Sequence, residues 1–135
     1  DYAAPVIQTA ITALLTDLRL SGSALILAGF SQGGMMSLHC GLRLDPAPAA
    51  IVSFSGALLR HDDLSASGST SYPPVQLVHG SDDQVVPCAL MHEAARILSP
   101  LGVEVETVER PGLAHGIDPD GLTASINFLA AHITD

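Results

Sequence analysis

One serine lies in a pattern that is typical of an enzyme nucleophile. Residues Gly29, Phe30, Ser31, Gln32 and Gly33 have the form G-x-S-x-G, with an apolar run before them and a helical pattern after them. In an elbow of this form the serine occupies a strained turn, and the glycines let strand and helix approach without a side-chain clash. The pattern predicts Ser31 as a nucleophile, with Gly29 and Gly33 completing the elbow. The alternative is a plain turn in which Ser31 caps the helix, since serine is a good N-cap.

A serine hydroxyl needs a base to take its proton, and the chain has six histidines to choose from. His115 lies in the glycine-containing segment 110–116 after the last predicted strand, and loops of this kind carry catalytic side chains on a rigid scaffold. The alternative is an exposed loop histidine. We expect His79, at the end of a predicted strand, to position the turn that follows it. The remaining histidines are better explained by helix packing or lie in an irregular segment: His39, His92, His132 and His61.

The third member of such a site is an acid that orients the imidazole and stabilises its charged form. Asp82 and Asp83 follow the third predicted strand, although aspartates are also ordinary turn residues. An acid between Ser31 and His115 agrees with the chain order of the α/β-hydrolases, in which serine is followed by acid and then histidine. Two aspartates after the histidine are predicted to begin a helix: Asp118 and Asp120.

The elements that must position these residues alternate along the chain. Short apolar runs bounded by turn residues predict strands that are buried on both faces, and apolar residues at helical spacing predict helices. The predicted strands cover 24–28, 50–54, 75–78 and 103–108, the last of them alternating and therefore at a sheet edge. The predicted helices cover 6–18, 35–44, 87–101 and 122–133, with a short one around 62–66.

Alternating strands and helices predict the α/β class, with about four parallel strands, right-handed crossovers and flanking helices. The length of 135 residues suits a single domain, residues 1–135. In such sheets the site forms at the carboxyl ends of the strands. Because each of the three candidate residues follows a predicted strand, we expect them to converge at that edge.

The composition excludes several classes of function. Hydrophobic residues make up 47% of the chain and charged residues 14%, as in a globular protein. The net charge is −9 with no lysine, so no basic patch for nucleic acid is expected. No apolar run approaches the roughly 20 residues of a membrane span. Cys40 and Cys88 fit neither a disulfide framework nor a metal motif, so we expect no metal and a reducing, cytoplasmic location.

Three segments resemble the phospholipase/carboxylesterase family, which includes the acyl-protein thioesterases and small bacterial carboxylesterases. They are Gly-Phe-Ser-Gln-Gly-Gly at 29–34, His-Gly-Ser-Asp-Asp-Gln-Val-Val-Pro at 79–87 and Gly-Leu-Ala-His-Gly at 112–116. The resemblance covers essentially the whole chain, and the Phe-Ser-Gln-Gly-Gly elbow is its most specific part.

The resemblance implies a role for each candidate. Ser31 is the nucleophile, His115 is the base, and the acid is Asp83 and not Asp82. The backbone N–H of Gln32 is one donor of the oxyanion hole. No cofactor is implied.

The chain also departs from the family pattern. Family members have further strands before the elbow, and a loop among them supplies the second oxyanion donor. Here one predicted helix precedes the strand at 24–28, and the sequence does not open on methionine. We therefore expect an N-terminally truncated chain, the C-terminal part of an α/β-hydrolase fold. Its apolar strand 24–28 would form an open edge, able to pair with a missing half or with a second copy in a homodimer.

The leading hypothesis is hydrolysis of a small-molecule carboxylic ester or thioester through an acyl-enzyme. Val86 and Leu113, close to the predicted site, are candidates for an acyl pocket, and ordinary packing is the alternative for both. A peptidase or dienelactone-type hydrolase of the same fold is the runner-up, since fold and triad do not fix the substrate. An inactive fragment that acts only by association stays open as a different class.

Overall fold

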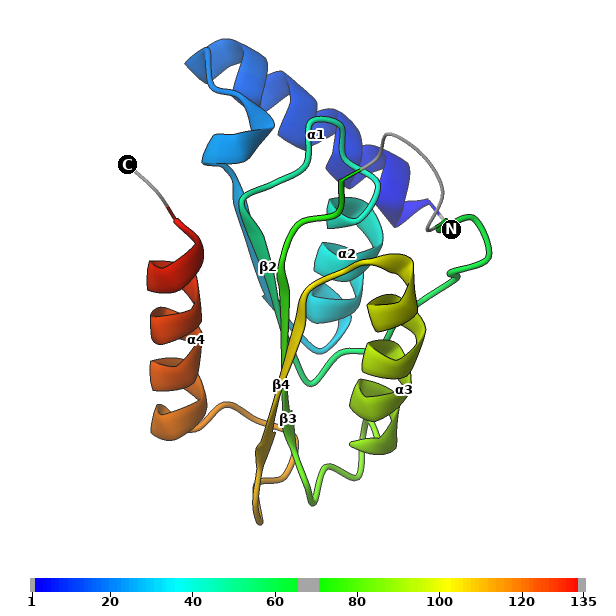
Figure 1. Cartoon of the computed structure of the whole chain (residues 1–135), viewed down its shortest axis with the longest axis vertical. Coiled ribbons are helices and arrows are strands. Elements are labelled where there is room, and N and C mark those ends of the chain that lie inside the picture. The colour runs from blue at the N-terminus through cyan, green and yellow to red at the C-terminus, as the bar shows by residue number, and fades with distance from the viewer. Residues whose placement is uncertain (1, 66–70, 134–135) are drawn as a thin grey trace.

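The computed structural model describes residues 2–65 and 71–133. Within this part, four strands form one parallel sheet in the order β1-β2-β3-β4, with α-helices between them (Figure 1). The strands are β1 (Ile26–Phe30), β2 (Ala50–Phe54), β3 (Val75–Gly80) and β4 (Val105–Arg110). The α-helices are α1 (Ala3–Leu18), α2 (Gln32–Gly41), α3 (Ala89–Leu98) and α4 (Pro119–His132), and short 3₁₀ turns cover Gly22–Ala24 and Ser99–Leu101. The predicted α/β class with four parallel strands and flanking helices is confirmed.

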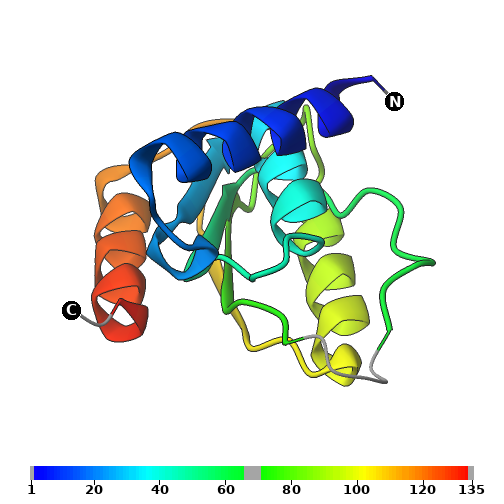
Figure 2. The same cartoon turned by 90° about the horizontal axis from the view of Figure 1, so that it is seen from above.

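The sheet is covered on both faces. Helices α2 and α3 lie on one face and α4 on the other, while α1 lies across the end where the strands begin (Figure 2). Alternation along β2 divides the core accordingly, because successive side chains point to opposite faces of a strand. Ile51 packs in the cluster with Leu38 of α2 and Leu98 of α3. Val52 packs with Phe128 of α4.

Strand β1 differs from its prediction in position and in burial. The 3₁₀ turn at 22–24 takes up the start of the predicted run 24–28, and the strand continues to Phe30, which pairs in register with Phe54. β1 is the outer strand of the described sheet and pairs with β2 alone, so Ala28 and Phe30 are exposed. The prediction of burial on both faces is wrong for this strand. Burial throughout is found instead in β2 and β3.

Other boundaries shift for local reasons. Helix α2 starts at Gln32, earlier than predicted, because the turn before it uses only one residue. Helix α3 starts at Ala89 and not at Pro87, because the carbonyls of Pro87 and Cys88 accept from N–H groups three residues ahead, those of Leu90 and Met91, as in a 3₁₀ turn. Residues 62–65 of the short helix predicted around 62–66 contain a turn and no helix, and residue 66 lies outside the described residues.

No helix within residues 2–65 or 71–133 combines the length and hydropathy needed to cross a bilayer.

Candidate active site

Ser31 occupies a strained turn between β1 and α2. Its backbone has φ 56° and ψ −117°, a conformation that residues other than glycine rarely adopt. The turn is held from both sides: the Ser31 N–H donates to the Phe54 carbonyl at 2.8 Å, and the Ser31 carbonyl accepts from the Met35 N–H at 3.0 Å. Strain that the surroundings hold in place is typical of functional residues.

The glycines around this turn differ in whether a side chain would have room at their positions. A Cβ on Gly29 would lie 2.2 Å from the Gly33 carbonyl oxygen, so the strand meets the helix only because residue 29 has no side chain. A Cβ on Gly33 would meet nothing within 4 Å, so the clash predicted for that position is absent. Gly34 has the second close approach instead, because a Cβ there would lie 2.6 Å from the Ser53 hydroxyl oxygen. It is the second glycine of the Gly-Gly pair, and sequence reasoning did not assign it a role.

Three side chains far apart in sequence form one hydrogen-bonded chain. Ser31 Oγ lies 3.0 Å from His115 Nε2, and His115 Nδ1 lies 2.7 Å from Asp83 Oδ2. An ionised carboxylate can only accept, so Nδ1 donates to Asp83. In the neutral ring Nε2 is then an acceptor, and the Ser31 hydroxyl donates to it. The structure thus brings together the serine, histidine and acid predicted from the sequence, in the geometry that deprotonation of a serine requires.

Asp83 is held on both carboxylate oxygens. Its side chain is fully buried, and Oδ1 accepts from the N–H groups of Val85 and Val86 at 2.9 Å each. Burial raises the pKa of this carboxyl, but the hydrogen bonds from His115, Val86 and Val85 outweigh it and hold the pKa below the ordinary value. Asp83 is therefore a carboxylate at neutral pH. Its neighbour Asp82 is exposed and accepts from the Ser81 hydroxyl at 3.0 Å.

His79 supports the turn that carries Asp83. Its ring is buried, and Nε2 lies 2.6 Å from the Val86 carbonyl oxygen, which can only accept, so Nε2 carries the proton. The same nitrogen lies 3.4 Å from Asp83 Oδ2. His79 is a strand residue and not a turn residue, but its ring positions the following turn, as the sequence predicted.

The loop that carries His115 is bound to the loop that carries Asp83. The Gly112 N–H donates to Ser81 Oγ at 2.8 Å, and the Asp82 N–H donates to the Leu113 carbonyl at 2.9 Å. Gly80 makes this close approach possible, because a Cβ there would lie 2.2 Å from the Leu113 carbonyl oxygen. Sequence reasoning missed Gly80, although it stands in the His-Gly-Ser-Asp-Asp segment.

An ion-pair cluster holds the other end of the His115 loop. Arg110 Nε bonds to both carboxylate oxygens of Asp118, and its Nη2 bonds to Asp120 at 3.1 Å. Asp118 also accepts from the Gly121 N–H as the N-cap of α4, so the predicted role of both aspartates at a helix start is confirmed. These contacts fix the loop between the end of β4 and the start of α4.

The remaining predicted site residues have defined places. Gln32 is the first residue of α2, and its N–H lies in the first helical turn, where no intrahelical acceptor exists. Val86 is buried, and both its N–H and its carbonyl are engaged in the Asp83 turn. Leu113 is half-buried, and its carbonyl joins the two loops. Contact of either residue with an acyl group stays a prediction.

Three exposed apolar residues lie next to or close in sequence to Ser31, Asp83 and His115. The Phe30 ring lies 4.7 Å from the His115 ring between centroids and is 39% exposed. Val85 lies two residues after Asp83, and Ile117 lies two residues after His115. These two residues are exposed by 69% and 46%. Sequence reasoning did not single out these three residues, because their exposure depends on the loop conformations.

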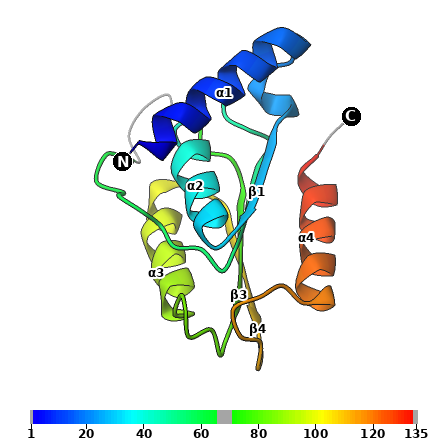
Figure 3. The same ribbon diagram turned by 180° about the vertical axis from the view of Figure 1, so that it is seen from behind.

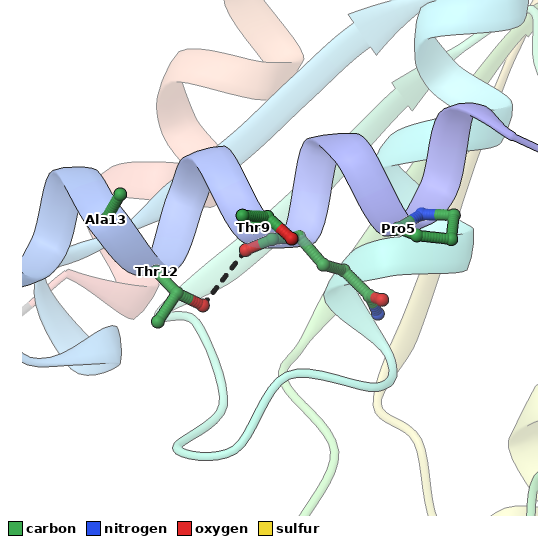
Figure 4. Close-up of a pocket in the computed structure, with 5 residues that line it drawn as sticks. Pro5, Thr9, Thr12 and Ala13 are labelled. Carbon is green, nitrogen blue, oxygen red and sulfur yellow. Dashed lines mark hydrogen bonds between the residues drawn. The ribbon is translucent and has the colours of Figure 1, made fainter.

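A broad surface depression lies elsewhere, along α1 (Figure 4). It is lined by Pro5, Gln8, Thr9, Thr12 and Ala13, and the Thr12 hydroxyl donates to the Gln8 carbonyl at 2.9 Å. A single helix face forms it, and it contains none of the residues described above. Helix α1 lies at the end of the sheet where the strands begin, whereas Ser31, Asp83 and His115 follow the other ends of β1, β3 and β4 (Figures 1 and 3).

Comparison with solved structures supports this fold. Esterase PE8 superposes with a TM-score of 0.89 and 37% identity, covering 97% of this chain and 60% of that one. Arabidopsis thaliana SOBER1 superposes with a TM-score of 0.86 at 21% identity, covering 98% of this chain and 63% of that one. At the second identity the likeness shows the fold alone.

Comparison of sequences gives relatives that are longer than this chain. Acyl-protein thioesterase 1 of Gibberella zeae is 34% identical over 109 residues, which is 78% of this chain and 46% of the relative. The protein of the same name from Emericella nidulans is 31% identical over 118 residues, 84% of this chain and 49% of the relative. The chain spans about half the length of these two relatives. The sequence model of the phospholipase/carboxylesterase family matches residues 1–133, and the chain belongs to this family.

Proposed function

We propose that this chain, residues 1–135, is the partial α/β-hydrolase domain of a serine hydrolase that cleaves carboxylic esters or thioesters through an acyl-enzyme. The observation that carries the proposal is the hydrogen-bonded chain from Ser31 Oγ through His115 to Asp83. The names of the related proteins, an esterase and acyl-protein thioesterases, support the substrate class.

The proposed reaction has two halves. Ser31 Oγ attacks the acyl carbonyl carbon while its proton passes to His115 Nε2, and the buried Asp83 carboxylate stabilises the imidazolium. Collapse of the tetrahedral intermediate breaks the bond to the alcohol or thiol, which leaves with the proton from Nε2. Water then attacks the acyl-enzyme with His115 as the base, and the acid is released with Ser31 restored.

The negative charge on the carbonyl oxygen needs donors that are already in place. The N–H of Gln32, at the start of α2, is the proposed donor. N–H groups in the first turn of a helix have no intrahelical acceptor and lie at the positive end of the helix dipole, which supports this role. Loss of one such donor costs about 10²–10³ in rate. The proposed oxyanion hole has a second donor. It would come from the segment that, in the relatives, precedes the part matched by this chain.

The acyl group would lie against the apolar side chains beside the hydrogen-bonded chain. Phe30 supports this, because its partly exposed ring lies 4.7 Å from the His115 ring, and Val85 and Ile117, two residues after Asp83 and His115, are exposed as well. An ester or thioester with an aliphatic acyl chain would match these exposed apolar side chains.

The adjacent aspartates give a matched test of this mechanism. Asp83→Asn should lower hydrolysis of p-nitrophenyl butyrate by about 10⁴-fold, because the amide favours the wrong imidazole tautomer. Asp82→Asn should leave the rate within a few-fold of the parent, because within residues 2–65 and 71–133 the Asp82 carboxylate bonds only to the exposed Ser81 hydroxyl. Equal rates for the two variants, or hydrolysis that survives Ser31→Ala, would contradict the proposal.

A second proposal concerns association. Strand β1 pairs on one side only in the described sheet, and Ala28 and Phe30 are exposed beside that free edge. An apolar open edge invites pairing with another chain, so we propose that two copies, or this chain and a preceding half, join there. Ala28→Lys should then convert a dimer to a monomer in size-exclusion chromatography with light scattering. A parent chain that is monomeric at high concentration would exclude the homodimer.

A reducing, cytoplasmic location is also proposed, supported by the two free thiols of Cys40 and Cys88. Cell fractionation with a tagged chain tests it, and recovery from an oxidising compartment would exclude it.

A further inference from the structure

Three metal-ligating side chains meet apart from the Ser31 site. Cys88 stands at the start of α3, His92 lies in its first turns, and Glu109 comes from β4. Glu109 Oε1 lies 3.2 Å from Cys88 Sγ and 3.0 Å from His92 Nε2. One ligand atom from each residue lies within 4.8 Å of the other two. Ligands of a tetrahedral zinc ion sit about 2.0–2.3 Å from the metal, so atoms this close together can share one ion after small side-chain movements.

The fold brings the three residues together through backbone positions. Cys88 and His92 are four residues apart, and side chains at this spacing lie one above the other on a helix face. Helix α3 packs against β4, and its first turn lies at the end of the sheet where β4 ends (Figure 1). Glu109 is next to last in β4, opposite His79 in the register of the sheet. The cluster therefore requires no rearrangement of the chain.

The chemistry of the donors selects the ion. A thiolate, an imidazole and a carboxylate form a mixed sulfur, nitrogen and oxygen set, which suits Zn²⁺, whereas Mg²⁺ and Ca²⁺ prefer oxygen ligands alone. We propose that Cys88, His92 and Glu109 form a Zn²⁺ site that leaves one coordination position open to water. The side chains of His92 and Glu109 are 56% and 48% exposed, so an ion can reach the cluster from solvent. On binding, the Cys88 thiol releases its proton to become the ligand.

The site is distinct from the proposed catalytic residues but joined to them by the chain. Cys88 ends the segment that begins at Asp83 and holds that carboxylate. A bound ion would tie the start of α3 to β4 and so fix the far end of this segment. Since an ion that binds only the folded chain shifts unfolding by mass action, Zn²⁺ should raise the thermal midpoint.

Cobalt substitution tests the site without any measurement of activity. The purified chain, freed of metal with a chelator, is titrated with Co²⁺ and followed by absorption, then back-titrated with Zn²⁺. We expect one Co²⁺ per chain, a thiolate-to-cobalt charge-transfer band, tetrahedral d–d bands, and loss of all of these when Zn²⁺ displaces the cobalt. Native mass spectrometry should show one zinc ion per chain.

Variants assign the ligands. Cys88→Ser should abolish the charge-transfer band, and His92→Gln and Glu109→Gln should each weaken Co²⁺ binding by more than the roughly 10–100-fold that loss of an outer-shell partner costs. His92 and Glu109 are exposed, so circular dichroism should show that the His92→Gln and Glu109→Gln variants keep the fold. Glu93→Gln, next to His92 and exposed, should bind Co²⁺ like the parent.

A second control separates a thiol-containing site from an ordinary pair of histidine and carboxylate. His132 Nε2 lies 3.3 Å from Glu104 Oε1 and has no cysteine in the pair, so His132→Gln should not change the titration. The proposal is overturned if no charge-transfer band develops, if the band persists in Cys88→Ser, or if His92→Gln and Glu109→Gln bind as tightly as Glu93→Gln.

Discussion

Substitution of Gly80 by alanine should disable the site without touching any of its reacting groups. Gly80 ends β3 directly before the segment with Asp83, and the loop with His115 crosses it. A Cβ at residue 80 would lie 2.2 Å from the Leu113 carbonyl oxygen, 2.5 Å from the Ala114 carbonyl oxygen and 2.7 Å from the Leu113 carbonyl carbon. These are backbone atoms, so no side-chain rotation can relieve the contact.

The size of the effect follows from the distance. Ordinary carbon contacts are about 3.5–4.0 Å, so the backbone two residues before His115 must withdraw by at least about 1 Å. A misplacement of about 1 Å costs about 10²-fold in a reaction that depends on alignment. The rate at which a fluorophosphonate modifies Ser31 is the appropriate assay, because it reports the nucleophile and its base without requiring a natural substrate. We expect Gly80→Ala to lower this rate by about 10²-fold.

Gly116→Ala is the matched control. Gly116 follows His115 in the same loop, but a Cβ there would meet nothing within 4 Å, and its φ lies outside the positive range that favours glycine. This variant should react within a few-fold of the parent. The reasoning is refuted if Gly80→Ala folds and is labelled as fast as Gly116→Ala, or if both variants slow equally.

Three further predictions concern stability and reactivity. His79→Ala leaves the Val86 carbonyl without its partner, and urea unfolding should show a loss of about 1–3 kcal/mol; an unchanged midpoint would contradict the positioning role. The hydrogen bond from Arg43 lowers the pKa of Asp63 to about 2, so the pair stabilises the chain above about pH 4 and loses its effect as the pH falls toward 2; Asp63→Asn should be less stable at pH 6, with the difference vanishing near pH 2. Burial, then the hydrogen bond and charge of Glu109, raises the pKa of Cys88 to about 11; metal-free protein should react with iodoacetamide at pH 8 at least about tenfold more slowly than a free thiol, and Glu109→Gln should speed the reaction.

The sequence predicted β2 and the edge position of β4 better than the burial of β1. For β2 the predicted and observed bounds are the same, 50–54, and its residues are buried throughout, as the mainly apolar run indicated. For β1 a wholly apolar run gave the wrong burial, because exposure depends on which strands stand beside it and not on its own residues. The short helix expected near 62 failed because composition alone cannot distinguish a turn from one helical turn.

The candidate residues were predictable where residue types alone carry the chemistry. Serine, acid and histidine in a fixed chain order, each after a strand, indicated Ser31, His115 and one of the two aspartates Asp82 and Asp83 before any geometry was known. The choice of Asp83 over Asp82 came from resemblance, and the structure supplies its contacts: Asp83 is buried with three donors, whereas Asp82 is exposed.

The supporting residues were not predictable in the same way. Gly80 and Gly34 matter because of backbone atoms that approach from other segments, and no local pattern reports such an approach. The cluster of Cys88, His92 and Glu109 escaped motif reasoning for the same reason. Its third residue is 17 positions from the second and comes from a neighbouring strand. Long-range packing, and not residue type, creates both features.

The most direct test of the central proposal is covalent labelling of Ser31. The purified chain is treated with a fluorophosphonate, and its intact mass and the modified residue are determined by mass spectrometry. We predict one adduct per chain on Ser31, and its loss in His115→Ala, because Ser31 Oγ donates to His115 Nε2 at 3.0 Å and needs that base. Correctly folded protein that gains no adduct, or that is labelled equally in His115→Ala, would contradict the account.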